Sequence, residues 1–188
     1  MKIILASESG FRRRALDLLG LDYEVYPSSI DEKSIRDADP VALTRRLAEA
    51  KALKVAEDVP NAVIVSGDAV VAKDGAIYEK PRDKPEAKTF LAELSASQFK
   101  FVTGLAVIRS DTRRMVSIAE VSEIRFRHLI EREIDEYVNR HDVLKYAGGF
   151  EAEGVLRFAE EILGSYNFIT ALPVNRLILF LRDQGVDI

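Results

Sequence analysis

An acidic residue, Asp68, lies inside the most apolar segment of the chain, Ala62–Ala72. Such an apolar run is typical of a buried strand. Burial of an ionised carboxylate without a partner costs on the order of several kcal/mol, so Asp68 needs a cation, a metal ion or an opening onto water. Alternatively, Ser66-Gly67-Asp68 forms a turn that ends the strand, although the apolar run resumes at Val70. The first interpretation makes Asp68 the leading candidate for a chemical role.

A second residue of unexpected type, Lys51, lies in a segment whose apolar residues recur at helical spacing. Lys51 shares a helix face with Leu47, Ala48 and Val55. Either its aliphatic stem covers the edge of that face while the ammonium reaches water, or the ammonium binds an anionic group. The spacing alone leaves both interpretations open.

Hydroxyl and arginine side chains follow the first apolar run, Ile3–Ala6. Ser7-Glu8-Ser9-Gly10 separates this run from a helical segment that begins at Phe11 and contains Arg12. Backbone N–H groups at a helix start, together with hydroxyls and guanidinium groups, can bind phosphate. Serines at a helix start more often act only as caps, so the pattern by itself is a weak signal.

The composition limits the classes of protein to consider. With 188 residues, 47% hydrophobic and 31% charged, the chain has the profile of one globular domain. A formal net charge of -4 provides no overall basic field for nucleic acid, so a polyanionic ligand needs a local basic cluster. The absence of cysteine excludes disulfides, thiolate metal sites and a cysteine nucleophile. No apolar run approaches the ~20 residues of a membrane helix, and no secretory segment opens the chain, so we expect a cytoplasmic protein with no membrane partner.

Helices and strands alternate along the chain, and long hairpins argue against a purely parallel sheet, so a mixed α/β or α+β fold is expected. Strands are predicted at Ile3–Ala6, Tyr23–Tyr26, Ala62–Ala72, Ile77–Tyr78, Phe99–Ile108, Met115–Phe126, Phe158–Ile162 and Tyr166–Ile169. Helices are predicted at Phe11–Leu19, Val41–Glu57, Pro85–Leu94, Ile130–Val138 and after Pro173, with loops at Ser28–Pro40 and Ala147–Gly154. A change of alternation between Val121 and Ile124 predicts a β-bulge.

Short motifs recur in order over essentially the full chain, and together they are far more specific than any one of them. They are Leu5-Ala6-Ser7 with Arg12-Arg13, Ile30-Asp31-Glu32, Leu47-Ala48 with Lys51-Ala52, Gly67-Asp68, Lys80-Pro81, Thr103-Gly104, Glu133-Ile134 with Tyr137-Val138, Ala147-Gly148 with Gly154, Gly164-Ser165-Tyr166 and Leu172-Pro173. The set resembles the Maf-like nucleoside triphosphate pyrophosphatases. The resemblance implies one Maf-like domain over residues 1–188 and a homodimer. It also implies a Maf/ITPase-like fold, in which helices flank a long curved mixed sheet and a cleft separates two lobes.

The resemblance also implies a reaction, the hydrolysis of a nucleoside triphosphate between the α- and β-phosphates to give a monophosphate and pyrophosphate. It implies a divalent cation, Mg²⁺ or Mn²⁺, held by Glu32 and Asp68, with Asp68 as proton acceptor and Glu32 holding metal or water. The roles it implies for the other residues are phosphate contacts from Ser7 and Arg12, and triphosphate binding by Lys51 and Lys80. These cations would compensate much of the triphosphate charge. The family is associated with the exclusion of modified nucleotides, and some members with arrest of cell division.

Three positions concern the base. In the branch of the family that acts on dTTP and UTP, the residues at the positions of Phe11, Ala69 and Glu153 are arginine, threonine and glutamine. In the 7-methyl-GTP branch, the residue at the position of Phe11 is aromatic and the residue at the position of Glu153 is glutamate. This chain is closer to the 7-methyl-GTP branch, although Ala69 matches neither. A carboxylate can accept both N1–H and the exocyclic amine of guanine, and stacking of a cationic 7-methylguanine on Phe11 would add roughly 0.5–2 kcal/mol. Alternatively, Phe11 packs in the core and Glu153 faces solvent.

Other functions stay open at this point. The alternatives are a dTTP/UTP-type or inosine-type pyrophosphatase, a non-catalytic regulator of cell division, and a nucleic-acid binder that uses Arg12-Arg13-Arg14. The intact set Glu32, Lys51, Asp68 and Lys80 argues against a non-catalytic protein, and the net charge of -4 argues against nucleic acid.

Overall fold

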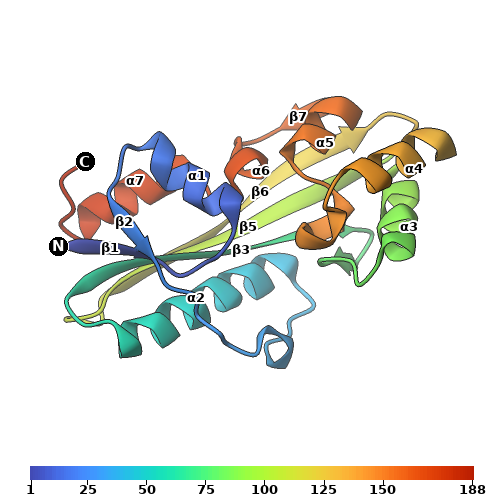
Figure 1. The fold of residues 1–188 in the computed structure, drawn as a ribbon. Helices are drawn as coiled ribbons and strands as arrows, with labels where there is room; N and C mark the ends of the chain where they lie inside the picture. Colours follow the sequence, from blue (N-terminus) through green and yellow to red (C-terminus); the bar gives the residue numbers. More distant parts are fainter.

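Three long strands form the centre of the molecule (Figure 1). β3, β5 and β6 are each 12 residues long and pair in antiparallel order. The computed structural model describes residues 1–188. Its strands are β1 (Lys2–Leu5), β2 (Tyr23–Val25), β3 (Ala62–Lys73), β4 (Ala76–Tyr78), β5 (Gln98–Arg109), β6 (Met115–Phe126) and β7 (Ala159–Leu163). They run in the order β2-β1-β3-β5-β6-β7, with β4 paired to β3. Because β1 is parallel to both neighbours and every other pair is antiparallel, the expected mixed sheet is confirmed.

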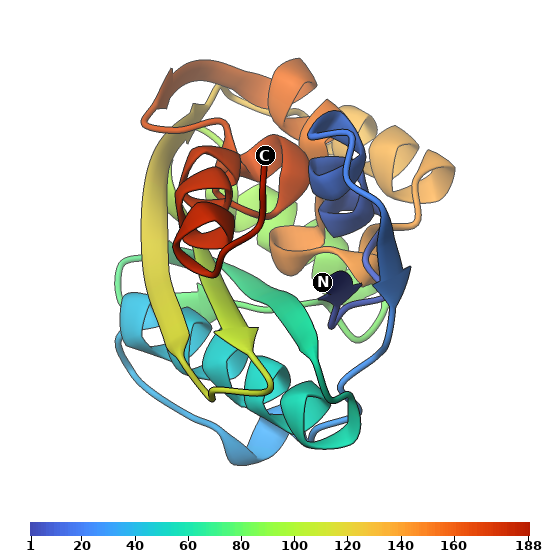
Figure 2. The same ribbon diagram turned by 90° about the vertical axis from the view of Figure 1, so that its left-hand side faces the viewer.

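Helices cover both faces of this sheet. α2 lies along one face, α1 and α7 lie on the other face near the two termini, and α3, α4 and α5 gather at the far end of the long strands (Figures 1 and 2). The helices are α1 (Gly10–Leu18), α2 (Pro40–Asp58), α3 (Lys84–Leu94), α4 (Glu131–Arg140), α5 (Ala152–Phe158), α6 (Asn167–Thr170) and α7 (Val174–Asp183), with short 3₁₀ turns η1 (Glu32–Ser34), η2 (Val143–Lys145) and η3 (Ala147–Gly149). No helix combines the length and apolar character needed to cross a membrane.

The local sequence fixes both the start of α2 and its distance from the sheet. Asp39 accepts a hydrogen bond from the backbone of Val41, and Pro40 occupies the first helical position, where its missing N–H is not needed. Gly104 of β5 faces the backbone of Thr44, and a Cβ at this glycine would collide with the Thr44 carbonyl. The helix that carries Lys51 can therefore pack closely on β5.

The apolar core lies in separate clusters along the sheet. Near the termini, one cluster packs beneath α1 and α7 and another beneath α2, on opposite faces of β1, β3 and β5. A larger cluster, rich in phenylalanine, fills the far end beneath α3, α4 and α5. Buried polar residues lie between these clusters, and they include Lys51, Ser66, Asp68, Thr103, Ser122 and Asn167. The candidate chemical residue thus belongs to a polar belt across the middle of the sheet.

Two of the predicted elements near the C-terminus are wrong. Tyr166–Ile169 was expected as a strand, but Asn167–Thr170 forms α6. Asn167 is buried, donates to Thr103 Oγ1 at 2.8 Å and accepts from Ser122 Oγ at 2.6 Å. These long-range polar contacts override the strand propensity of the local residues. The predicted loop Ala147–Gly154 is a loop only in part, because α5 begins at Ala152.

The bulge predicted between Val121 and Ile124 is also wrong. β6 pairs continuously with β5 from Met115 to Arg125, and the irregularity lies at Arg125/Phe126 against β7. The alternation changes in sequence because the surroundings of the strand change along it. Ser117 contacts Glu49 of α2 on one face, whereas Ile124 enters the phenylalanine-rich cluster on the other.

Candidate active site

Asp68 lies at a gap in the pairing of β3. On this edge β1 pairs with β3 only as far as Val65, and β4 pairs only from Val71 onward. The strand itself is continuous, because Asp68 pairs with Gly104 of β5 on the other side. The turn considered for Ser66-Gly67-Asp68 is therefore excluded. At this gap Asp68 lines a cleft, so the buried acid borders solvent-accessible space.

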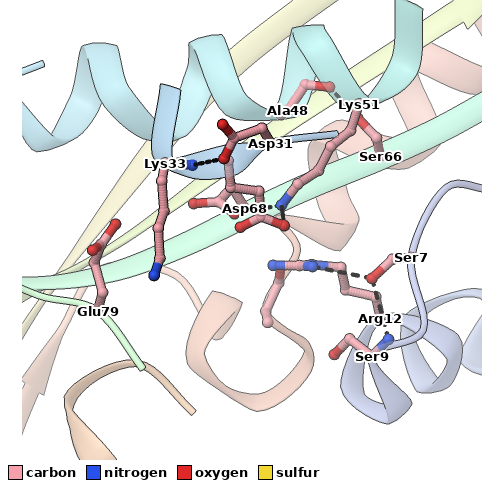
Figure 3. Close-up of polar contacts among 12 residues, drawn as sticks. Ser7, Ser9, Arg12, Asp31, Lys33, Ala48, Lys51, Ser66, Asp68 and Glu79 are labelled. Atoms are coloured by element: carbon pink, nitrogen blue, oxygen red, sulfur yellow. Dashed lines mark hydrogen bonds and ion pairs between the residues drawn. The ribbon is translucent and has the colours of Figure 1, made fainter. Parts of the chain in front are cut away.

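Lys51 joins the two predicted catalytic acids. Its Nζ donates to Asp68 Oδ1 at 2.7 Å (Figure 3) and lies 3.1 Å from Glu32 Oε1. The side chains of Lys51 and Asp68 are only 6% and 10% exposed, whereas Glu32 is 50% exposed. The ammonium is therefore buried in an ion pair, and the interpretation that it reaches water beyond the apolar face is wrong. We refer to Glu32, Lys51 and Asp68 as the charged triad.

A capped turn positions Glu32. Asp31 accepts a hydrogen bond from the backbone N–H of Lys33 at 3.1 Å (Figure 3), which closes the short turn η1. Glu32, in this turn, lies 3.1 Å from Lys51 Nζ. Partial burial opposes ionisation of Glu32, but the positive charges of Lys51, Lys80 and Arg12 outweigh it. The pKa of Glu32 is consequently lowered from its ordinary value, and the carboxylate is ionised at neutral pH.

Arg12 lies beside the charged triad in the same cleft. It donates through Nη1 to Ser7 Oγ at 3.1 Å (Figure 3) and through Nε to the carbonyl of Ala171 at 3.4 Å. Burial lowers the pKa of Arg12, and the charges of Asp68 and Glu32 oppose that effect. A Cβ at position 67 would clash with Leu172 and press on Arg12, so Gly67 leaves the space that this guanidinium occupies. Ser7 and Arg12 are thus brought together beside Asp68.

A cleft of about 1020 Å³ connects these groups. Six basic and three acidic side chains line it, so the cleft is locally positive although the chain carries a net charge of -4. The basic residues include Lys80, as predicted, and Lys145, which the sequence did not single out. The local basic cluster that a polyanionic ligand would need is present.

A small apolar pocket of about 60 Å³ adjoins the cleft. Phe11, Ala69 and Tyr146 line both spaces. The rings of Phe11 and Tyr146 meet edge to face, with centroids 5.2 Å apart. Phe11 is half-buried and belongs to none of the core clusters, so the alternative that it packs in the core is wrong.

Glu153 is the predicted site residue that lies apart from the others. Its side chain is 59% exposed, lies 3.6 Å from Arg157, and lines neither the cleft nor the apolar pocket. Glu151, two residues earlier, lines the apolar pocket. Glu151, Tyr146 and Lys145 were not predicted as site residues. Glu151 lies in the predicted loop Ala147–Gly154, and no element was predicted at Lys145 and Tyr146.

Two sets of residues have donor atoms suited to a metal ion. Glu32 and Asp68 present carboxylate oxygens to one point, now held by Lys51 Nζ. His141, Glu151 and Glu153 form a second group, whose ligand atoms lie within 4.8 Å of one another. The first set faces the cleft, and the combination of carboxylates with phosphate oxygens is the one that Mg²⁺ prefers.

Comparison with known proteins gives full-length matches. The family described as "Maf-like protein" matches residues 2–184. A dTTP/UTP pyrophosphatase of Syntrophus aciditrophicus is 35% identical over 98% of this chain and 90% of its own length. A 7-methyl-GTP pyrophosphatase of Aliivibrio fischeri is 33% identical over 100% of this chain and 98% of its own. Among solved structures, a HAM1 protein from Coxiella burnetii matches with a TM-score of 0.46 and 14% identity, over 97% of this chain and 99% of that one.

Proposed function

The chain belongs to the Maf-like protein family, and from that premise we propose that it is a nucleoside triphosphate pyrophosphatase. It cleaves the bond between the α- and β-phosphates and releases a nucleoside monophosphate and pyrophosphate. The observation that carries the proposal is the charged triad, which lies in a positively charged cleft at the pairing gap of β3. Relatives named dTTP/UTP and 7-methyl-GTP pyrophosphatase support the reaction class.

Asp68 acts as the proton acceptor. A water oxygen forms a bond to the α-phosphorus, the bond from that phosphorus to the bridging oxygen breaks, and pyrophosphate leaves. The proton of the water passes to the Asp68 carboxylate. A positioned side chain can accept a proton in this way when it lies within hydrogen-bond reach of the water. Lys51 has three N–H donors, so it can hold Asp68, Glu32 and one phosphate oxygen together. The triad thereby aligns base and substrate.

Basic groups along the cleft hold the rest of the triphosphate. Arg12, Ser7 and Lys80 all line the cleft and bind phosphate oxygens. Because Arg12 is half-buried and already bonded to Ser7 and to a carbonyl, little side-chain freedom is lost when a phosphate binds. Lys80 is exposed and lines the cleft, so it can follow a flexible phosphate chain.

The residues present fit a divalent cation. Two carboxylates plus phosphate oxygens and water match the ligands that Mg²⁺ uses in phosphate chemistry, and Glu32 and Asp68 both line the cleft in which the phosphates would lie. When bound, Mg²⁺ or Mn²⁺ would neutralise charge on the phosphate oxygens. Glu32 is the better placed of the two acids to change partner, since half of its surface is exposed.

For the base, we propose a guanine nucleotide such as 7-methyl-GTP, so that the enzyme would remove modified nucleotides. The support is an aromatic pair, Phe11 and Tyr146, at the mouth of the apolar pocket, with an acidic side chain, Glu151, in the wall of that pocket. The small Ala69 leaves the mouth open between them. We further propose a homodimer that acts in the cytoplasm, on the family resemblance alone, and light scattering of the purified protein measures the oligomeric state.

The test is a screen for pyrophosphate release with Mg²⁺ or Mn²⁺ over GTP, 7-methyl-GTP, dTTP, UTP and inosine triphosphate. We expect one pyrophosphate for each monophosphate formed, with guanine substrates preferred. Release of inorganic phosphate with a diphosphate product would overturn the proposed bond cleavage. A preference for dTTP or UTP would retain the reaction and overturn the proposed base.

A further inference from the structure

The apolar pocket beside the cleft contains a single acidic side chain in its wall, Glu151. Glu151 immediately precedes α5, and its side chain is 21% exposed. The other residues around it are mostly apolar or aromatic, and they include Tyr146 and Phe150. Because burying the charge of a carboxylate among apolar groups is unfavourable without a polar partner, Glu151 needs polar contacts to hold this position.

Two groups hold Glu151 in place. His141 Nδ1 lies 2.6 Å from Glu151 Oε1, and the backbone N–H of Glu151 donates to the hydroxyl of Tyr137 at 3.1 Å. Tyr137 stacks on His141 with ring centroids 4.3 Å apart. Gly154 faces the Tyr137 hydroxyl, where a Cβ would collide with it. Of the two carboxylate oxygens, Oε1 is engaged by His141, and no hydrogen bond is formed to Oε2.

We propose that Glu151 reads the base of the nucleotide, by accepting hydrogen bonds from two adjacent N–H donors of a guanine-type ring. The inference rests on the proposed function and names a residue that determines its substrate class. Guanine presents N1–H next to an exocyclic amine, and an ionised carboxylate offers about four lone-pair sites on two oxygens to receive them. Uracil and thymine flank their one N–H with carbonyl oxygens, which a carboxylate repels.

The surroundings of the pocket mouth agree with this assignment. Phe11 and Tyr146 line both the cleft and the pocket, so a ring that lies across the mouth has aromatic faces beside it and Glu151 at its edge. Burial raises the pKa of the Tyr146 hydroxyl, and the negative charge of Glu151 raises it further, so Tyr146 stays uncharged. Glu153 lies on the outer side of Glu151 and is 3.6 Å from Arg157, which makes Glu151 the inner of the two carboxylates.

Matched variants separate the two carboxylates. Glu151→Gln and Glu153→Gln make the same chemical change two residues apart, and Glu160→Gln, on the exposed part of β7, serves as control. The measurements are kcat/KM for GTP, 7-methyl-GTP, dTTP and UTP, with circular dichroism to verify folding. We expect Glu151→Gln to lower kcat/KM on both guanine substrates by roughly 10- to 100-fold, through KM, and to spare or improve dTTP and UTP. An unchanged substrate ranking, or a change in Glu153→Gln alone, would overturn the inference.

A binding measurement makes the test independent of turnover. Calorimetry with guanosine monophosphate and uridine monophosphate should show weaker guanosine monophosphate binding in Glu151→Gln, with uridine monophosphate unaffected. Equal affinity of wild type and variant for guanosine monophosphate would sink the inference even if the enzyme is active. Absence of pyrophosphate release by wild type from every triphosphate would overturn the proposed function instead.

His141 acts as a positioning residue in this scheme. His141→Ala should raise KM for guanine substrates and leave kcat unchanged, because Glu151 loses the group that fixes its orientation. His141→Gln, which keeps an N–H donor near Glu151, should restore part of the preference. If His141 served only the fold, all nucleotides would be affected alike, and that result would contradict its positioning role.

Discussion

At the scale of residues, the pairing of Lys51 with Asp68 determines how the acid can work. A buried ion pair needs good geometry to offset desolvation, and Lys51 Nζ meets Asp68 Oδ1 at 2.7 Å. The sequence singled out both residues because each is a charge in an apolar pattern. It did not show that they contact each other, because their contact depends on how α2 lies on β3.

Asp68→Asn should lower kcat for pyrophosphate release by at least ~100-fold, because the amide keeps the shape of the side chain but cannot accept the proton. Binding of the triphosphate should be largely preserved. Asp74→Asn is the matched control, since Asp74 lies in the exposed turn after β3 at φ 51, a conformation that asparagine tolerates. Near-normal turnover of Asp68→Asn would remove Asp68 from the mechanism.

Glu32 makes a pH-dependent contribution to stability. Its pKa is lowered in the folded protein, so the contribution is present above its ordinary value of 4.5 and is lost as the pH falls through the lower folded value. We expect Glu32→Gln to reduce the free energy of unfolding at neutral pH by less than ~1 kcal/mol, because the group is half exposed. Urea unfolding at several pH values measures this. A difference that persists unchanged at a pH well below 4.5 would contradict it.

At the scale of elements, the pairing gap of β3 creates the site. The apolar pattern predicted β3 and β5 well because long buried strands have strong local signals, and alternation predicted β6, which is mostly half-buried. The gap could not be predicted, because it depends on where β1 and β4 stop pairing. Glu32 and Glu151 lie in segments expected as loops, and only tertiary contacts bring them to the triad and to the pocket.

Gly104→Ala should destabilise the protein by about 1–3 kcal/mol, because the new methyl group would force α2 away from β5. The shift would also move Lys51, so turnover should fall even at temperatures where the variant is folded. Gly10→Ala is the stability control, since a Cβ there meets nothing within 4 Å. Thermal unfolding and kcat measured together test the coupling, and equal melting temperatures for both variants would contradict the close approach.

At the scale of the whole molecule, charge is distributed unevenly. The chain carries a net charge of -4, yet basic side chains outnumber acidic ones in the cleft. The two apolar cores on either side of the polar belt keep this cleft at the middle of the sheet. The composition correctly indicated that any site for a polyanion must be local. The position of that site could not be predicted from composition, because it depends on the fold.

Triphosphate binding should therefore weaken with ionic strength. Raising NaCl from about 0.05 M to about 0.5 M should increase the Kd for a triphosphate several-fold and leave that of the uncharged nucleoside nearly unchanged, because exposed charges are screened. Lys80→Gln should reduce the salt dependence of triphosphate binding. Titration calorimetry gives both values. Identical salt dependence for triphosphate and nucleoside would show that the cleft charge does not act on the ligand.

The ion pair between Lys51 and Asp68 also has a consequence for the stability of the metal-free protein. Asp68 already has a covalently attached counterion, so its charge is compensated before any divalent ion arrives. Folding and metal binding are then separate events, whereas some small domains fold only when their metal binds. Prolonged treatment with a chelator should abolish pyrophosphate release and leave the melting temperature within about 2 °C of the untreated protein. Activity should return at once when Mg²⁺ is restored, without a refolding step; a chelator-induced unfolding transition would contradict this independence.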